Sequence, residues 1–280
     1  MRHLTWILLA LIPCAAIAGD NPRDHVEAST VITGWVEVAP DGSVYNYTLD
    51  QPEKLDTGVV GLIAKTITTW KFKPVLIDGK PVVAKARMNL RVVASPTGKG
   101  EYDIRVRGVT FGDGQPAAQP SYKDTKPPVY PMVAIRARTE GTVYLALEID
   151  RAGHVIQAAA EQVNLRAIGT AYEMKVLRNT FADASLAAAK GWTFNIPTTG
   201  TRASDDHWTV MVPVNFELSA WGHKPQERKY GQWDVYVPGP VQPIPWEQDK
   251  TASDTDADAV PDGLAFLHDT RFVLLTPPQG

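Results

Sequence analysis

Four aspartates near the carboxyl end of this 280-residue chain are spaced as calcium ligands could be. They are Asp254, Asp256, Asp258 and Asp262. These positions match the first, third, fifth and ninth residues of an EF-hand loop, where oxygen ligands bind Ca²⁺. The loop also needs glycine at its sixth position and an acidic residue at its twelfth, where this sequence has Ala259 and Ala265. Residues 254–262 are therefore predicted to be a solvated acidic tail, with calcium binding as the alternative, and we predict no cofactor.

The histidines and the single cysteine do not form a recognisable catalytic or metal site. His154, His207, His223 and His268 are scattered, without the H-E-x-x-H spacing that places two imidazoles on one helix face. The chain has no G-x-S-x-G elbow and no Walker loop. Cys14 falls in the amino-terminal apolar segment, so the rest of the chain has no thiol. We predict a protein that is not an enzyme, while a Ser/His/Asp set assembled only by folding stays open.

The amino-terminal residues have the three parts of a secretory signal peptide. A positively charged start precedes the apolar residues 6–18, and residues 16–18 form an A-x-A cleavage site. We therefore predict a signal peptide over residues 1–18 and export of the mature chain. An uncleaved inner-membrane anchor at residues 4–18 is the first alternative, although a spanning helix needs roughly 20 apolar residues. A lipoprotein signal ending at Cys14 is the second, and the proline before that cysteine fits it poorly.

Residues 26–111 have the patterning of a small unit that contains both strands and a helix. A first strand ends at an Asp41-Gly42 turn, from which a second strand returns. One helix face follows, at three- and four-residue spacing, formed by Val59, Ile63, Ile67 and Trp70. Residues 84–93 alternate between apolar and polar side chains, as does the next run, whose phase slips at Gly108 as at a β-bulge.

Residues 127–219 repeat this order after a linker at residues 112–126, which is rich in glycine, proline and lysine. An alternating strand leads to a turn at Gly153, and a helix is expected to begin after Thr180 or Asn179 as its N-cap. The apolar face of this helix contains Phe181, Ala184, Ala188 and Trp192. The segment is therefore predicted to be a second unit of the same kind.

The last strand of the second unit is predicted to lie at the edge of its sheet. Its even-numbered residues from Trp208 to Leu218 are apolar, and Pro213 lies on the opposite face. Proline has no N–H to donate to a neighbouring strand and is confined to edges and bulges. Residues 209–217 are therefore a candidate peptide-binding edge. The alternative is that the carboxyl-terminal segment or a second protomer covers this edge.

Each unit carries the same aromatic pattern after its helix. Trp70-Lys71-Phe72 is followed by Pro74, and Trp192-Thr193-Phe194 is followed by Pro197. We predict that these two W-x-F segments lie in a core beneath a sheet, with a ligand groove as the alternative. Their repetition predicts an α+β fold of two tandem units, each an antiparallel sheet of about three strands with a packed helix. Residues 220–280 either wrap the folded units or form a disordered tail.

The second unit resembles the TonB C-terminal domain family. The matching features are Tyr130-Pro131 at the entrance, Glu140-Gly141-Thr142-Val143 opening a strand, Gly153 in the turn, Trp192-x-Phe194 with Pro197, and the final strand V-M-V-P-V-N-F-E-L. The resemblance covers roughly residues 122 to 219. The first unit looks like a diverged copy that lacks the Tyr-Pro entrance. No single motif is specific, and the resemblance rests on their order.

The resemblance implies a fold, a compartment and a partner. In that family a small sheet with a packed helix works in the Gram-negative periplasm, and its edge strand accepts an extended peptide from an outer-membrane transporter. The candidate partner-binding residues are then Tyr130, Pro131, Thr209, Met211, Pro213, Asn215 and Glu217. Tyr130 and Pro131 could instead fix the path by which the chain enters the domain. Full transducers of the family also carry a membrane anchor and a long proline-rich spacer, so we do not expect energy transduction by this chain alone.

The sequence thus predicts a periplasmic, TonB-like, protein-binding protein, in the context of siderophore or nutrient uptake, with an outer-membrane TonB-dependent transporter as the candidate partner. Two alternatives stay open: an accessory envelope protein without transporter contact, and a ligand carrier or hydrolase on the same fold. A net charge of −3 and a pI of about 6.1 provide no basic field for nucleic acid.

Overall fold

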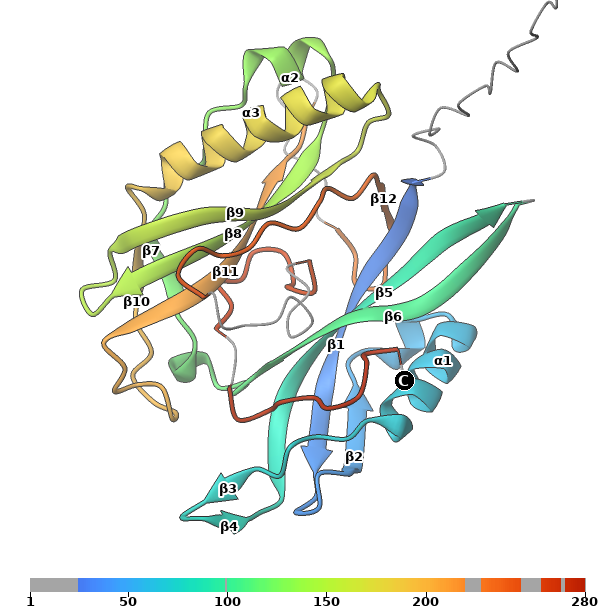
Figure 1. The fold of residues 1–280 in the computed structure, drawn as a ribbon, viewed down its shortest axis with the longest axis vertical. Helices are drawn as coiled ribbons and strands as arrows, with labels where there is room; N and C mark the ends of the chain where they lie inside the picture. Colours follow the sequence, from blue (N-terminus) through green and yellow to red (C-terminus); the bar gives the residue numbers. More distant parts are fainter. Residues whose placement is uncertain (1–24, 99, 220–227, 248–257, 268–269, 280) are drawn as a thin grey trace, which may run out of the picture.

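Figure 1 shows the computed structural model, in which residues 25–98, 100–219, 228–247, 258–267 and 270–279 are described. Antiparallel sheets and a few helices make it an α+β protein, as predicted. Within the described part of the chain, no helix is both long enough and apolar enough to cross a membrane. The predicted signal peptide and the alternative anchor lie outside the described residues.

The first sheet has five strands, of which four come from the first unit and one from the carboxyl-terminal segment. They are β1 (Glu27–Val38), β2 (Val44–Leu49), β5 (Ala84–Gly98), β6 (Glu101–Gly112) and β12 (Asp234–Tyr236). The order is β12-β1-β5-β6, with β2 also paired to β1. This is more than the three or so strands expected, because β6 folds back beside β5 and β12 adds to β1. The bulge predicted at Gly108 is confirmed, since the register of β5 and β6 skips Arg107.

The helix of the first unit is α1 (Thr57–Thr69), and it buries the face predicted for it. Asp56 caps its amino end by accepting a hydrogen bond from the backbone N–H of Gly58 (2.7 Å). Its buried side chains and Trp70 join one apolar cluster with the inner face of the first sheet. A short hairpin of β3 (Leu76–Ile77) and β4 (Lys80–Pro81) then leads into β5.

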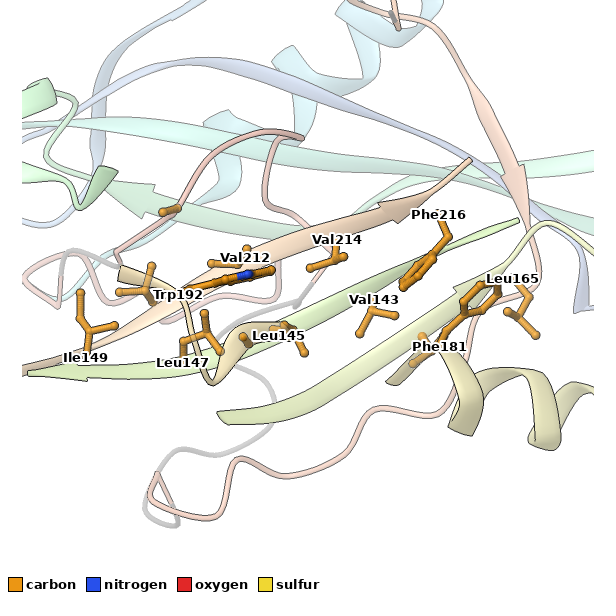
Figure 2. Packing of buried hydrophobic residues seen from close by; sticks show 14 of the residues in the cluster. Val143, Leu145, Leu147, Ile149, Leu165, Phe181, Trp192, Val212, Val214 and Phe216 are labelled. Carbon is orange, nitrogen blue, oxygen red and sulfur yellow. The ribbon is translucent and has the colours of Figure 1, made fainter. Parts of the chain in front are cut away.

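The second sheet has three strands and a helix on one face. The strands are β8 (Gly141–Asp150), β9 (Val155–Leu165) and β11 (His207–Phe216), in the order β11-β8-β9. Helix α3 (Ala171–Ala189) covers this sheet at the top of Figure 1. Figure 2 shows the core between them, in which alternate side chains of β8 and β11 lie against Phe181 and Trp192. The alternating apolar face predicted for the last strand is therefore buried from Trp208 to Phe216, while Leu218 lies beyond the strand and is 38% exposed.

The start predicted for this helix was wrong. Helix α3 begins at Ala171, with Thr170 as its N-cap, and not near Thr180. Thr170 and Glu173 form a capping box, in which the Thr170 hydroxyl accepts from the Glu173 N–H while the Glu173 carboxylate accepts from the Thr170 N–H. Two of the four free N–H groups at the helix start are thereby satisfied, which fixes the start nine residues earlier than the apolar face indicated.

The two W-x-F segments lie in equivalent cores, as predicted. In each unit the backbone N–H of the phenylalanine donates to the carbonyl of the hairpin glycine: Phe72 to Gly42 (2.8 Å) and Phe194 to Gly153 (2.9 Å). Both glycines have φ near +80°. A Cβ at either position would lie about 2 Å from the same phenylalanine's carbonyl oxygen, at 2.0 Å and 1.9 Å respectively. Only glycine allows this approach, and the shared geometry supports the predicted duplication, which stays a prediction.

The described parts of the carboxyl-terminal segment wrap both units. Strand β12 extends the first sheet, and Val237 then exchanges two backbone hydrogen bonds with Leu165 of β9 (2.8 and 3.1 Å). Near the end of the chain, Phe272 enters the first core. For these residues the disordered alternative is wrong, because the segment supplies a strand, backbone bonds and buried side chains. The predicted linker is also partly structured, since β7 (Ser121–Asp124) pairs with β10 (Thr193–Asn195).

Residues 258–267, which we call the strap, lie between the two sheets. Asp258 at one end forms ion pairs with Arg91 and Arg107 of the first sheet. Val260 and Phe266 pack against the second sheet, on the face opposite α3. The strap is the red-orange chain between the sheets in Figure 1. The second sheet is therefore covered on both faces, by a helix on one and by the strap on the other.

Candidate peptide-binding edge

Strand β11 lies at the edge of the second sheet, which confirms the position predicted from Pro213. It pairs with β8 on one side, and within the described residues no strand pairs with its other side. On that open side Met211 forms an antiparallel bridge with Phe266 of the strap. The N–H of Met211 donates to the Phe266 carbonyl (2.8 Å), and the N–H of Phe266 donates to the Met211 carbonyl (2.9 Å).

This bridge determines which backbone groups of β11 point away from the sheet. In an antiparallel strand the N–H and C=O of one residue point the same way, and successive residues alternate. The backbone N–H and C=O of Met211 point away from β8, toward the strap. The backbone polar groups of Thr209, Pro213 and Asn215 therefore point away from β8 as well. Pro213 therefore costs no bond to β8, since its missing N–H would have faced away from the sheet. The outward groups nearest the strand's end are the Pro213 carbonyl and the N–H and C=O of Asn215.

The side chains predicted to bind a partner are covered to different degrees. Met211 is 4% exposed and belongs to a small apolar cluster with the strap. The hydroxyl of Thr209 accepts a hydrogen bond from the indole N–H of Trp246 (3.1 Å). Asn215 is exposed, and its side-chain oxygen accepts from the Thr142 hydroxyl (2.7 Å). Within the described part of the chain, the middle of the strand, including the buried Pro213, is thus covered by the chain's own residues, while Asn215 near its end is exposed.

Glu217, just beyond β11, is held by charged neighbours from distant parts of the chain. Its carboxylate lies 3.1 Å from Arg228 and 3.9 Å from Arg166. Glu140 and Asp234 also pair with Arg166. Burial raises the pKa of Glu217 and the nearby carboxylates add to the rise, while Arg166 opposes it. Glu217 therefore fixes the end of the strand and is not a free recognition group.

Tyr130 and Pro131 belong to the entrance of the second unit. The Tyr130 ring packs edge-to-face against Phe181 and Phe216, at centroid distances of 5.8 and 5.5 Å. Its hydroxyl donates to the Thr139 carbonyl (2.6 Å), and burial raises its pKa to about 12. Pro131 is the N-cap residue of the short helix α2 (Met132–Arg136). These contacts favour the structural role that the sequence left open.

The entrance also carries exposed apolar side chains. Val129 is 85% exposed and Met132 is 61% exposed. They flank Tyr130, whose ring contacts Phe216 at the end of β11. Exposed apolar side chains are available for contact with another protein. Sequence patterning missed these residues because no periodicity marks a five-residue helix.

The acidic residues 254–262, for which calcium binding was the alternative, are engaged in other contacts where they are described. Asp258 is 1% exposed, so it is not the solvated residue that was predicted. Although burial opposes its ionisation, Arg91 and Arg107 hold the pKa of Asp258 below its usual range. Asp262 pairs with Arg228 (3.1 Å), and the other two aspartates lie outside the described residues. Among the described side chains, no group of three or more His, Cys, Asp or Glu could hold a metal ion.

Sequence comparison finds a similar protein for part of this chain. The chain is 36% identical over 101 residues to "Protein TonB" of two strains of Xanthomonas campestris pv. campestris. The chain contains a TonB-like region. The match covers 35% of this chain and 38% of those relatives, so the chain spans well under half the length of the curated proteins that it matches. No family model and no solved structure matches the chain.

The match supports a TonB-like region in the chain, and its assignment to the second unit stays a prediction. The diverged first copy and the missing anchor stay predictions, as do the domain boundaries and the partner-binding residues. The geometry adds what is bonded to the edge: the strap bonds the backbone of Met211, and no other described residue forms a backbone hydrogen bond with the outward groups of Pro213 and Asn215.

Proposed function

We propose that this chain is a non-enzymatic binding protein of the Gram-negative envelope, whose β11 edge adds an extended peptide of a partner protein as an antiparallel strand. The observation that carries the proposal is the row of outward backbone groups on β11. One of them already bonds an antiparallel segment, the strap. Main-chain hydrogen bonds would supply affinity, and alternate side chains would supply specificity. The TonB-like region suggests an outer-membrane transporter as the partner.

The first sheet provides an internal example of such a complex. Strand β5 follows the W-x-F segment of the first unit, as β11 follows that of the second. Strand β6 pairs with β5 along its outer side. The two strands pair from Arg87↔Gly112 to Gly98↔Glu101, with register shifts at Arg91/Val92 and Pro96/Gly98. A partner peptide beside β11 would take the place that β6 takes beside β5.

Photo-crosslinking in intact cells tests the proposal. A photoreactive phenylalanine analogue replaces Asn215 at the open end of β11, or Tyr45 of β2, which is 71% exposed and serves as the control. We expect a product with an outer-membrane transporter, identified by mass spectrometry, from position 215 only. No transporter product at position 215, or the same product at both positions, would contradict the transporter proposal.

The compartment is part of the same proposal. Export by residues 1–18 would leave a periplasmic protein that begins at Gly19, whereas the alternative anchor at residues 4–18 would keep it at the inner membrane. Intact-mass measurement of the protein purified from its own cell envelope distinguishes the two. A mature chain that starts at Gly19 supports export, and a chain that still carries residues 4–18 supports the anchor.

A second candidate function rests on a cavity in the first unit. A volume of about 620 Å³ is lined mainly by apolar side chains of α1 and the strand ends, among them Val59, Ile104 and Trp233. This favours carriage of an apolar ligand. The two carboxylates in its lining are already engaged, because Asp56 caps α1 and Glu27 pairs with Arg107. The cavity therefore offers no convergent catalytic set, and hydrolysis has less support than carriage.

A further inference from the structure

The strap resembles a bound ligand more than a structural strand. Phe266 is the strap residue that bridges β11, and the segment around it has no regular strand structure. Its ring is almost fully buried against Tyr144, Ala146 and Met211 of the second sheet. One side chain thus enters an apolar site while its own backbone completes two hydrogen bonds with Met211. This is how a peptide is recognised in strand addition.

Outside this bridge the strap is held at both ends. The side chain of Gln119 accepts a hydrogen bond from the N–H of Leu267 (2.8 Å) and donates one to its carbonyl (3.2 Å). At the other end, Asp258 is held by Arg91 and Arg107. Ala265 and Leu267 pack in the core of the second unit. On the side of the first sheet, Pro261 and residues 263–266 line an open volume of about 400 Å³, so the strap packs on the second sheet and faces open space on its other side.

The outward groups beyond the bridge give an external peptide an advantage. A peptide that continues antiparallel along β11 past Met211 would reach the carbonyl of Pro213 and the N–H and C=O of Asn215. The strap does not bond these groups within the described residues. An external peptide can therefore form every backbone bond that the strap forms and additional ones as well.

We propose that residues 265–267 are an internal ligand of the β11 edge. The edge selects extended peptides with an aromatic or large aliphatic residue opposite Met211, and a partner peptide must displace Phe266 to bind. This proposal deepens the strand-addition function and rests on it. It adds the chemical class of the peptide and a competitor built into the chain.

Peptide titration of the full mature chain tests the proposal. The probe is a fluorescent peptide with the sequence of residues 260–267, V-P-D-G-L-A-F-L. We expect Phe266→Ala to bind it about tenfold more tightly than the wild type, because a site occupied by an internal competitor loses apparent affinity in proportion to its occupancy. Leu264→Ala is the matched control, since Leu264 is half-exposed and does not bridge β11; it should bind as the wild type does. A probe with alanine in place of phenylalanine should bind none of these proteins.

Two results would overturn the internal-ligand proposal. One is equal affinity of the wild type and Phe266→Ala for the probe, and the other is equal affinity for the probe and for its version with alanine in place of phenylalanine. Thermal unfolding checks that the variants are folded, and Phe266→Leu, which keeps an apolar side chain, should bind with intermediate affinity. If transporter crosslinking at Asn215 persists while the titration fails, only the internal ligand is refuted. If the titration succeeds and the crosslink is absent, the edge binds peptides but the transporter is not the partner.

Discussion

The strand that follows the W-x-F segment has a different neighbour in each of the two sheets. In the first sheet, β5 lies between β1 and β6, and β6 is joined to it by a tight turn and paired over most of its length. In the second sheet, β8 is the one strand that pairs with β11 among the described residues, and on the other side of β11 these residues form one bridge, to Phe266. A strand joined by a hairpin keeps the backbone groups of its neighbour hydrogen-bonded, because its effective concentration is high and its many backbone bonds form together. A bridge from a long loop satisfies only the backbone groups of the residue that it contacts, here Met211.

This difference separates two solutions to the same problem. An exposed edge strand is a site for unwanted pairing, and proteins cover it or interrupt it. The first sheet uses a full strand, whereas the second uses Pro213 and a removable segment. Function by strand addition is therefore open to the second sheet and closed to the corresponding side of the first.

The largest expected effect is on hydrogen exchange of the native full chain. The N–H of Leu90 lies in β5 with a strand on each side, so it exchanges only when the sheet opens, and its protection approaches the global unfolding free energy, about 5–15 kcal/mol. The N–H of Asn215 points outward, so we expect it to exchange almost as fast as an exposed amide. Met211 should be intermediate, since release of the strap frees it. Residue-resolved exchange by NMR measures all three, and equal protection of Leu90 and Asn215 would show that the β11 edge is closed.

Much of this arrangement is predictable from local sequence signals. The strand at residues 84–93, the helix face ending at Trp70, the bulge at Gly108 and the edge position of Pro213 all appear as predicted, although both faces of that strand are buried from Met88 on. Each depends on residues within a few positions of one another, where side-chain direction is fixed by the backbone period. The early start of α3 also had a local signal, the Thr170–Glu173 capping box, which the apolar pattern outweighed.

The state of the site was not predictable in the same way. Met211 and Phe266 are far apart in the chain, and no spacing rule connects them. Asp258 belonged to an apparent calcium pattern, while its actual partners are arginines from β5 and β6. Such contacts arise from packing between elements, so single-sequence patterns identify the edge strand without showing what occupies it.

The ion pairs that anchor the strap provide the next test. Replacing Arg91 by methionine removes its pair with Asp258 (3.4 Å) and its hydrogen bond to the Tyr144 hydroxyl (2.6 Å). We expect a loss of about 3 kcal/mol in unfolding free energy, because a buried carboxylate loses one of its two arginine partners. Arg105→Met is the matched control, since its pair with Asp103 is exposed and should contribute less than about 1 kcal/mol. Chemical denaturation measures both, and equal effects would contradict the anchor.

The ion pairs of Asp258 also make the stability of the folded protein depend on pH. The pKa of Asp258 is lowered in the folded protein, so its contribution to stability is complete above the unfolded pKa of about 3.8 and is lost as the pH falls through the lower folded value. Asp258→Asn should remove this part of the acid sensitivity. Denaturation curves of the wild type and Asp258→Asn at pH 3 and pH 7 measure the difference. An unchanged pH dependence would mean that the carboxylate is not paired as the structure shows.

The smallest expected effect tests whether the hairpin turn supports the W-x-F segment in the same way in both units. Gly42→Ala and Gly153→Ala should each cost about 2 kcal/mol or more in unfolding free energy, because both positions have φ near +80° and the new Cβ would lie about 2 Å from a W-x-F carbonyl. Gly79→Ala separates the two causes, since φ is +75° there with nothing within 4 Å, so it should cost only about 1 kcal/mol. Thermal or chemical denaturation measures all three. A large cost at Gly153 with none at Gly42 would mean that the hairpin turns support their W-x-F segments differently, and the difference between the two sheets would then begin well before β5 and β11.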